Sequence, residues 1–247
     1  MQILEVGAKS AVAGVAETAD AINLLSATMK GYNMELTGES AQAVSDYAFT
    51  AVRLGQTTFP ELASSMGKVI PIANALNISQ EELWGTMATF TGVTGNTAEV
   101  ATQLRGVLAG LASPTEAMLD VLIPISDELI KTGELQGGVT EKYKDARAEL
   151  DKLTNQYKIL DDKKEAGNAL TEEENNQMKM LKTNIKSVSD ELDEYAGGLS
   201  TAIIQSIGFP ELLTRINEAA AGNTGMLKEM FGRIEATTLA LSAGQIL

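Results

Sequence analysis

Residues 57–115 read TTFPELASSMGKVIPIANALNISQEELWGTMATFTGVTGNTAEVATQLRGVLAGLASPT, and this stretch carries several helix start signals in close succession. A Ser or Thr followed three residues later by Glu is a capping box, in which each side chain satisfies a free backbone N–H. Thr58 and Glu61 have this spacing, with Pro60 in the first turn, where a missing N–H costs nothing. Similar signals recur at Ser79 with Glu82, at Asn96 with Glu99, and at Ser113, Pro114 and Glu116. The stretch therefore predicts short helices that follow one another closely.

Apolar residues at helical spacing follow these start signals. The first apolar stripe runs from Phe59 to Leu76, and Pro71 inside it predicts a kink or a break. Trp84 lies on the next stripe and is expected in the core. Glycines also occur inside these predicted helices, at Gly67, Gly85, Gly106 and Gly110. Each costs about 1 kcal/mol relative to alanine, and close contact between helices is one reason to accept that cost.

The composition indicates an all-α protein. The chain has 247 residues, of which 44% are hydrophobic and only 4% aromatic, and helix-forming Ala, Leu, Glu and Met recur. No window shows the strict alternation of a half-buried strand. The length suffices for one or two domains with a sizeable core. Before the opening stretch, helices are expected over residues 3–17, from Thr18 to about Gly31, and from a cap at Ser40 to Gly55.

Charge and residue usage exclude several functions. A net charge of −14 argues against tight nucleic-acid binding, which needs clustered Lys and Arg to replace phosphate counterions. The chain has no His and no Cys, so His- and Cys-based catalysis and the commonest metal sites are unavailable. Residues 92–99, GVTGNTAE, lack the Lys of a phosphate loop, and Glu172-Glu173-Glu174 lacks the pattern of a calcium loop. We expect no enzyme activity, no cofactor and no catalytic, cofactor-binding or metal-binding residue.

The sequence contains no apolar run of the roughly 20 residues that a transmembrane helix needs. Its first residues, MQILEVGAKSAVAGVAETAD, lack the basic region and apolar core of a signal peptide. They are typical of the middle of a longer protein, so we expect the chain to be a fragment or module of one.

Residues 141–195 differ sharply from the rest, because 14 acidic and 10 basic side chains fall among these 55 residues. Two sets of apolar and aromatic residues recur there at alternating spacings of three and four, the pattern of a heptad seam. The first seam comprises Tyr143, Ala146, Leu150, Leu153, Tyr157 and Leu160, and the second comprises Met178, Leu181, Ile185, Val188, Leu192 and Tyr195. Gly167-Asn168 ends one helix, and Thr171 with Glu174 caps the next. The pattern predicts an antiparallel coiled-coil hairpin with arms of about 35 Å.

The charges of this hairpin are explained by a solvated face, with a docking arm or an oligomer contact as the alternative. After it, Gly197-Gly198 is expected to end the helix, and the earlier Ala- and Leu-rich pattern resumes. Phe209-Pro210-Glu211-Leu212 repeats the helix entry of residues 59–62, and an apolar face from Met226 through Ile234 to Leu239 follows. We therefore expect one compact multi-helix domain, formed by residues 1–140 and 196–247, with residues 141–195 inserted.

Residues 57–115 resemble the core region of phage tail tape measure proteins. The motifs that carry the resemblance keep their order along the chain: Thr57 to Leu62, Gly67 to Pro71, Glu81 to Leu83, Thr102 to Gly106, and Pro114-Thr115. Residues 18–56 resemble the region upstream of that core, and Asn223 to Leu241 the region downstream. Residues 141–195 are not part of the pattern, so the resemblance assigns them no function.

The resemblance implies a structural role in the virion tail. Tape measure proteins are long helical chains inside the tail tube that set tail length during assembly in the bacterial cytoplasm and leave at DNA ejection. The implied partners are the tail tube protein, tail assembly chaperones, tail-tip proteins and further copies of the chain. Prophages and tail-derived secretion systems use similar proteins. Two alternatives are a membrane-interacting helical module that aids DNA passage and, less favoured, an enzyme that degrades the cell wall.

Overall fold

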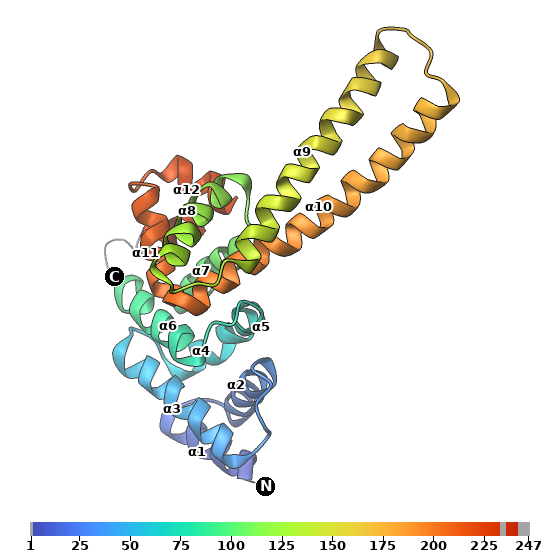
Figure 1. Ribbon diagram of the computed structural model, residues 1–247. Coiled ribbons are helices and arrows are strands. Elements are labelled where there is room, and N and C mark those ends of the chain that lie inside the picture. The colour runs from blue at the N-terminus through green and yellow to red at the C-terminus, as the bar shows by residue number, and fades with distance from the viewer. Residues whose placement is uncertain (1, 233–235, 242–247) are drawn as a thin grey trace.

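The computed structural model describes residues 2–232 and 236–241, and all regular structure among them is helical (Figure 1). The predicted all-α fold is confirmed. The elements are α1 (Gln2–Gly14), α2 (Thr18–Gly31), α3 (Gly38–Leu54), α4 (Phe59–Ser65), a 3-10 turn (Met66–Lys68), α5 (Ile70–Ala75), α6 (Gln80–Thr94), α7 (Thr97–Ala112), α8 (Glu116–Thr132), α9 (Gly138–Glu165), α10 (Glu172–Ile207), α11 (Phe209–Ala219) and α12 (Thr224–Phe231). Residues 236–241 are also helical, whereas Ile234 and residues 242–247 of the expected core lie outside the described part.

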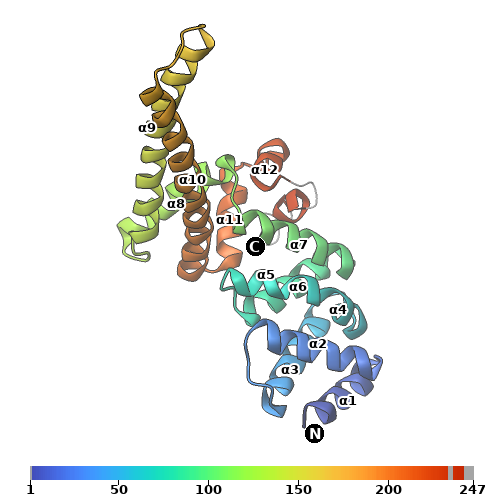
Figure 2. The same cartoon turned by 90° about the vertical axis from the view of Figure 1, so that its right-hand side faces the viewer.

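The elements form an elongated body from which one pair of helices projects. Figures 1 and 2 show α1, α2 and α3 at one end, α4 to α7 in the middle, and α8, α11 and α12 at the other end. Helices α9 and α10 leave this second end as an antiparallel pair, joined by a loop far from the body. The hairpin predicted from the two heptad seams is therefore present in the structure.

The capping boxes explain where the central helices begin. The Thr58–Glu61 and Ser79–Glu82 pairs form both reciprocal bonds, as predicted, at the starts of α4 and α6. Asn96 caps α7, with its side chain accepting from the backbone N–H of Glu99. The Glu99 carboxylate instead accepts from the Gln103 amide at 3.0 Å. The Asn96–Glu99 signal is therefore a single cap and not a reciprocal capping box.

Two predicted caps were assigned to the wrong residue. Helix α3 begins two residues before Ser40, and Thr37 is its cap, accepting from the Ser40 backbone N–H at 3.1 Å. Helix α8 is capped by Thr115, which accepts from the Met118 N–H at 3.3 Å, whereas Ser113 ends α7. The reason in the case of α8 is Pro114. A residue before a proline is disfavoured in the helical region, so Ser113 cannot open the helix, and α8 starts only after the proline.

Pro71 divides the first apolar stripe as predicted. Helix α4 ends at Ser65, a 3-10 turn follows, and α5 begins with Pro71 in its first turn. A proline there has no N–H bond to lose. Both halves of the stripe remain buried, with Leu62 and Met66 before the break and Ile70 after it.

Helix α7 lies at the centre of the body and contacts α4, α5, α6, α10 and α12. Its glycines allow the close approach that the sequence predicted. A methyl group at Gly106 would lie 3.2 Å from the Ala236 Cβ, and one at Gly110 would lie 2.9 Å from the Phe231 ring. That explanation is wrong for Gly67 and Gly85, where an added Cβ would have no described atom within 4 Å.

The expected helix end at Gly197-Gly198 is wrong. Helix α10 runs without a break from Glu172 to Ile207, through both glycines. A methyl group at Gly197 would lie 2.8 Å from the backbone carbonyl oxygen of Ala112, at the end of α7. The glycine therefore allows two helices to touch and does not end one of them. Beyond it, Leu199 and Ile203 are fully buried against the body.

This contact yields a prediction with an adjacent control. Gly197→Ala is expected to lower the free energy of unfolding by about 1–3 kcal/mol, because the Ala112 carbonyl cannot move without moving α7. Gly198→Ala places its methyl group 3.5 Å from the Val139 side chain, an ordinary contact. It is expected to raise stability by about 0.5–1 kcal/mol through helix propensity. Urea denaturation measures both variants, and equal effects would refute the steric explanation.

Candidate functional site: the projecting helical hairpin

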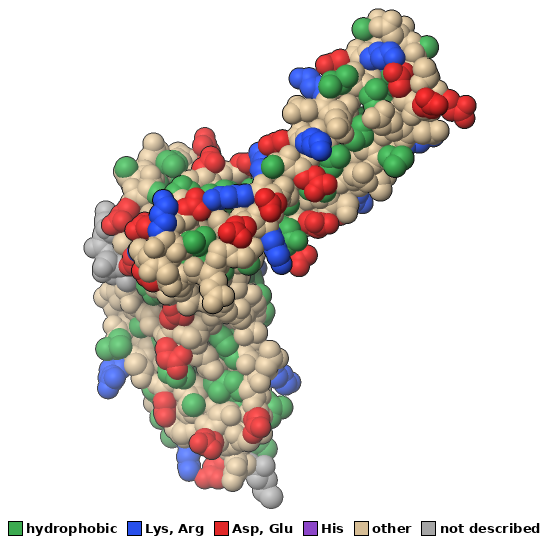
Figure 3. Space-filling model, viewed as in Figure 1, with side chains coloured by type: hydrophobic (Ala, Val, Ile, Leu, Met, Phe, Trp, Pro, Cys, Tyr) green, Lys and Arg blue, Asp and Glu red, His purple; other side chains and the backbone are tan. Residues whose placement is uncertain are grey.

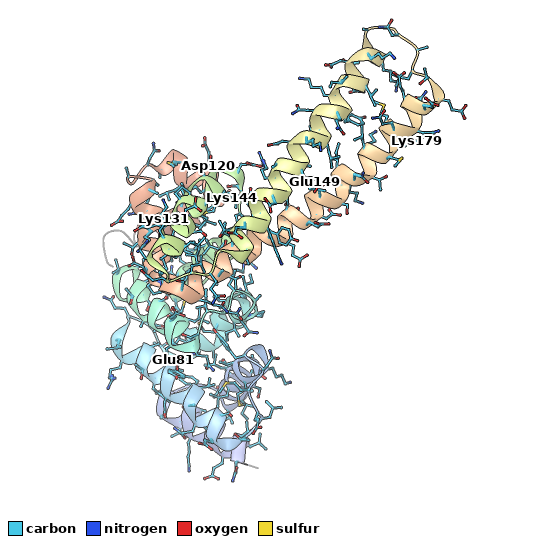
Figure 4. All side chains as sticks on the ribbon, in the orientation of Figure 1. Glu81, Asp120, Lys131, Lys144, Glu149 and Lys179 are labelled. Carbon is cyan, nitrogen blue, oxygen red and sulfur yellow. The ribbon has the colours of Figure 1, made fainter. Side chains whose placement is uncertain are left out.

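The base of the hairpin is fastened to α8 by polar contacts. The Ser126 and Thr140 hydroxyls share a buried hydrogen bond of 2.5 Å. Lys144, labelled in Figure 4, pairs with Asp127 at 2.6 Å, and nearby Arg147 pairs with Glu116. These contacts join residues that lie 14 to 31 positions apart in the sequence. They fix the direction in which α9 leaves the body.

Tyr143 closes the same base from the apolar side. Its side chain is almost fully buried, and this burial raises the pKa of its hydroxyl, with the Glu116 carboxylate adding to the effect. The base therefore combines an apolar anchor with ion pairs around it. No local pattern in the sequence predicts these contacts, because their partners lie on another helix.

The two predicted seams face each other between the arms. Among their members, Ala146 and Leu160 of α9 and Leu181, Val188 and Leu192 of α10 are buried. The other members are half-buried, except Tyr143, which belongs to the base. The arms are longer than predicted, with 28 residues in α9 and 36 in α10. Pairing between the seams needs no second chain, and a supercoiled geometry of the arms stays a prediction.

The far end of the hairpin is closed by a third capping box. Thr171 and Glu174 form both reciprocal bonds at the start of α10, as predicted. The Glu174 carboxylate also accepts from the Lys163 ammonium of α9 at 2.5 Å. The hydrogen bond from Lys163 and the backbone bond at Thr171 hold the pKa of Glu174 below its usual value. One carboxylate therefore caps α10 and ties it to α9.

On the face of the hairpin that Figure 3 shows, acidic and basic side chains are interspersed among uncharged ones. Two aromatic rings of the seams carry lysines over them, Lys182 over Tyr157 at 5.8 Å and Lys142 over Tyr195 at 5.9 Å. Large apolar side chains also reach solvent near the far end: Ile159 is 68% exposed and Met180 is 65% exposed. The hairpin is thus a solvated arm with apolar side chains near its tip, and it is the candidate interaction element of this chain.

The described residues hold no cluster of acidic side chains suited to a metal ion. Over residues 2–232 and 236–241, no three Asp or Glu side chains are placed to hold a metal ion. In the triad Glu172-Glu173-Glu174, the last carboxylate is occupied by Thr171 and Lys163. What the described residues do show is a helical body with a projecting arm, and this arm is the feature that stands out from the body.

The comparison with protein families gives the chain a more specific identity. The chain belongs to the family of phage-related minor tail proteins, whose model matches residues 1–232, a range that includes the hairpin. No curated protein and no solved structure matches the chain. The chain is therefore a structural component of a phage tail, located in the tail and associated with other tail components.

Proposed function

We propose that the chain is part of a tape measure protein, which sets tail length during assembly and leaves the tail at DNA ejection. The observation that carries this proposal is the family match over residues 1–232. The ordered motifs from Thr57 to Thr115, which resemble the tape measure core, add to it. The wholly helical structure of the described residues agrees with it.

A helical chain converts residue number into length at about 1.5 Å per residue. At that rise, the 55 residues from 141 to 195 correspond to about 80 Å, and the whole chain to about 370 Å. In the folded structure, α9 and α10 run antiparallel, so the hairpin returns the chain almost to its starting point. As a ruler, the chain has to adopt a more extended helical arrangement in the tail.

The implied partners are the tail tube protein, assembly chaperones, tail-tip proteins and further copies of the chain. The acidic character of the chain is consistent with a place inside a tail tube through which DNA must later pass. A protein with a net charge of −14 does not replace the counterions of the phosphate backbone, so it leaves the DNA free to move. We propose that the chain is assembled in the bacterial cytoplasm, and that the hairpin is inserted into a core formed by residues 1–140 and 196–247.

Tail length tests the proposal directly. In a phage that encodes this chain, an in-frame deletion of residues 141–195 is expected to shorten the tail by about 80 Å, because the ruler loses 55 helical residues. A tandem duplication of the same residues is expected to lengthen it by a similar amount. Negative-stain electron microscopy measures both changes.

The matched control changes the hairpin without changing the residue count. Leu181→Asp places a carboxylate in the buried seam and weakens the pairing of the arms. Tails of this variant are expected to keep the wild-type length. If deletion and duplication both leave the length unchanged, this segment is not part of the ruler.

A membrane-interacting module is the second candidate. In the part of the chain that the structure describes, no single helix is long and apolar enough to cross a membrane, but α7 and α8, bent by 73°, meet the criterion together. A liposome leakage assay with the isolated chain distinguishes the candidates. Leakage that grows with protein concentration favours the membrane module, and no lipid association at any pH refutes it.

A further inference from the structure

A cleft of about 390 Å³ lies between α6 and α11. Thr86 and Phe90 of α6 and Leu213 of α11 form its inner wall, and these side chains are 7%, 1% and 0% exposed. Pro210 and Gly85 also line it, and Gly85 is exposed. The cleft therefore has a largely apolar inner surface of buried side chains. It is formed by two helices more than 100 residues apart in the sequence.

Gly85 leaves this cleft open. A Cβ at this position would meet no described atom within 4 Å, and its φ lies outside the left-handed region. Neither packing nor backbone conformation therefore requires glycine, although alanine is more favourable inside a helix. What the glycine provides is space, since any larger side chain at this position would stand at the edge of the cleft.

Two carboxylates lie at one end of the cleft, at the start of α6. Glu82 is fixed in place, because it accepts from the Ser79 N–H and the Phe209 N–H at 3.0 Å each. Glu81, labelled in Figure 4, accepts from the Tyr47 hydroxyl, and this hydrogen bond lowers the pKa of Glu81 and keeps it ionised. Neither carboxylate forms an ion pair with a Lys or Arg in the described ranges.

The cleft thus combines an apolar wall with negative charge that no cation of the described residues neutralises. We propose that the α6–α11 cleft is a docking site for a segment of another protein, with an apolar side chain entering beside Gly85 and a neighbouring Lys or Arg pairing with Glu81. Charge complementarity carries the choice of occupant, because a second copy of an acidic chain would add repulsion at this end. The inference goes beyond tail-length control, and it stands without that proposal.

The test measures binding of a defined peptide to the full 247-residue chain by fluorescence anisotropy. The probe is a fluorescein-labelled 12-residue helical peptide with Leu at positions 2, 5 and 9 and Lys beside them. Two comparison peptides replace every Lys with Glu or every Leu with Ser. The chain is tested as wild type, as Gly85→Leu, as Glu81→Gln and as Gly67→Leu. Gly67 is the matched control, since it is exposed, open to the same extent and outside the cleft lining.

We expect the Leu/Lys peptide to bind the wild type and Gly67→Leu equally, and both comparison peptides to bind at least tenfold more weakly. Gly85→Leu is expected to keep its thermal stability and to weaken binding at least tenfold, because its side chain fills the cleft. Glu81→Gln is expected to weaken binding by about fivefold, the upper range for one exposed ion pair. If Gly85→Leu fails to fold, Glu81→Gln and the comparison peptides decide the question.

Three results would overturn the proposal. The first is no binding of the Leu/Lys peptide to the wild type. The second is equal binding of the Leu/Lys and Ser/Lys peptides, which would indicate attraction to the acidic surface alone. The third is unchanged affinity in a folded Gly85→Leu variant, or in Glu81→Gln.

Discussion

Phe59→Ala is expected to lower the free energy of unfolding by about 3–5 kcal/mol, the range for removing a large buried aromatic side chain. Phe59 is 1% exposed at the start of α4, and its ring centroid lies 5.0 Å from that of Phe49 on α3. On another side, a methyl group at Gly14 would lie 2.7 Å from the Phe59 Cβ, so α1 also packs tightly there. One ring therefore joins three helices, and its loss leaves a cavity that none of them can easily fill.

Phe49 provides the control for this prediction, because it touches the same ring but is only partly buried. Phe49→Ala is expected to lower stability by less than half as much. In a double-mutant cycle, the coupling between the two rings should be about 0.5–1.5 kcal/mol. Guanidinium denaturation of the four proteins measures these terms, and a loss below about 1 kcal/mol for Phe59→Ala would contradict the proposed role.

Glu82→Ala is expected to lower stability by about 2–4 kcal/mol, because one carboxylate serves two helix starts. It accepts from the backbone N–H and the hydroxyl of Ser79 at the start of α6, at 3.0 and 3.1 Å. It also accepts from the Phe209 N–H at the start of α11, at 3.0 Å. Hydrogen bonds to a charged group contribute about 1.5–3 kcal/mol each, and the solvent-exposed ones contribute less.

Glu99→Ala is the matched control, since Glu99 occupies the equivalent position of α7 without the reciprocal bond. Its carboxylate accepts from Gln103 within the same helix. We expect a change within about 0.5 kcal/mol, as for other surface substitutions. Thermal unfolding followed by circular dichroism compares the two variants. Similar losses would show that the α6–α11 bridge contributes little.

The contrast between Glu82 and Glu99 shows what the sequence could predict. Start signals within one helix are local, so the capping boxes at Thr58, Ser79 and Thr171 were found with their correct partners. The second role of Glu82 was missed, because its partner Phe209 lies 127 residues away and no local spacing records that contact. The resemblance between the two Phe-Pro-Glu-Leu segments marked α11 as a helix start but did not indicate its neighbour.

In the candidate site, too, the local features were predicted from the sequence and the long-range contacts were not. The heptad seams predicted the hairpin, because apolar spacing determines which faces of the two arms meet. Its attachment to the body was not predicted, since Lys144 and Arg147 reach partners on α8 through the folded geometry alone. The role of Gly197 was misread for a related reason: a glycine that ends a helix and one that admits a neighbouring backbone look alike in the sequence.

The continuity of α10 has a mechanical consequence. Its 36 residues give a rod of about 54 Å that begins at the hairpin tip and ends within the body. No flexible linker separates the arm from the body along this helix, and the backbone contact between Gly197 and Ala112 lies partway along it. Because the helix is unbroken, a force applied at the tip is transmitted along it into the body, where Gly197 lies against the end of α7.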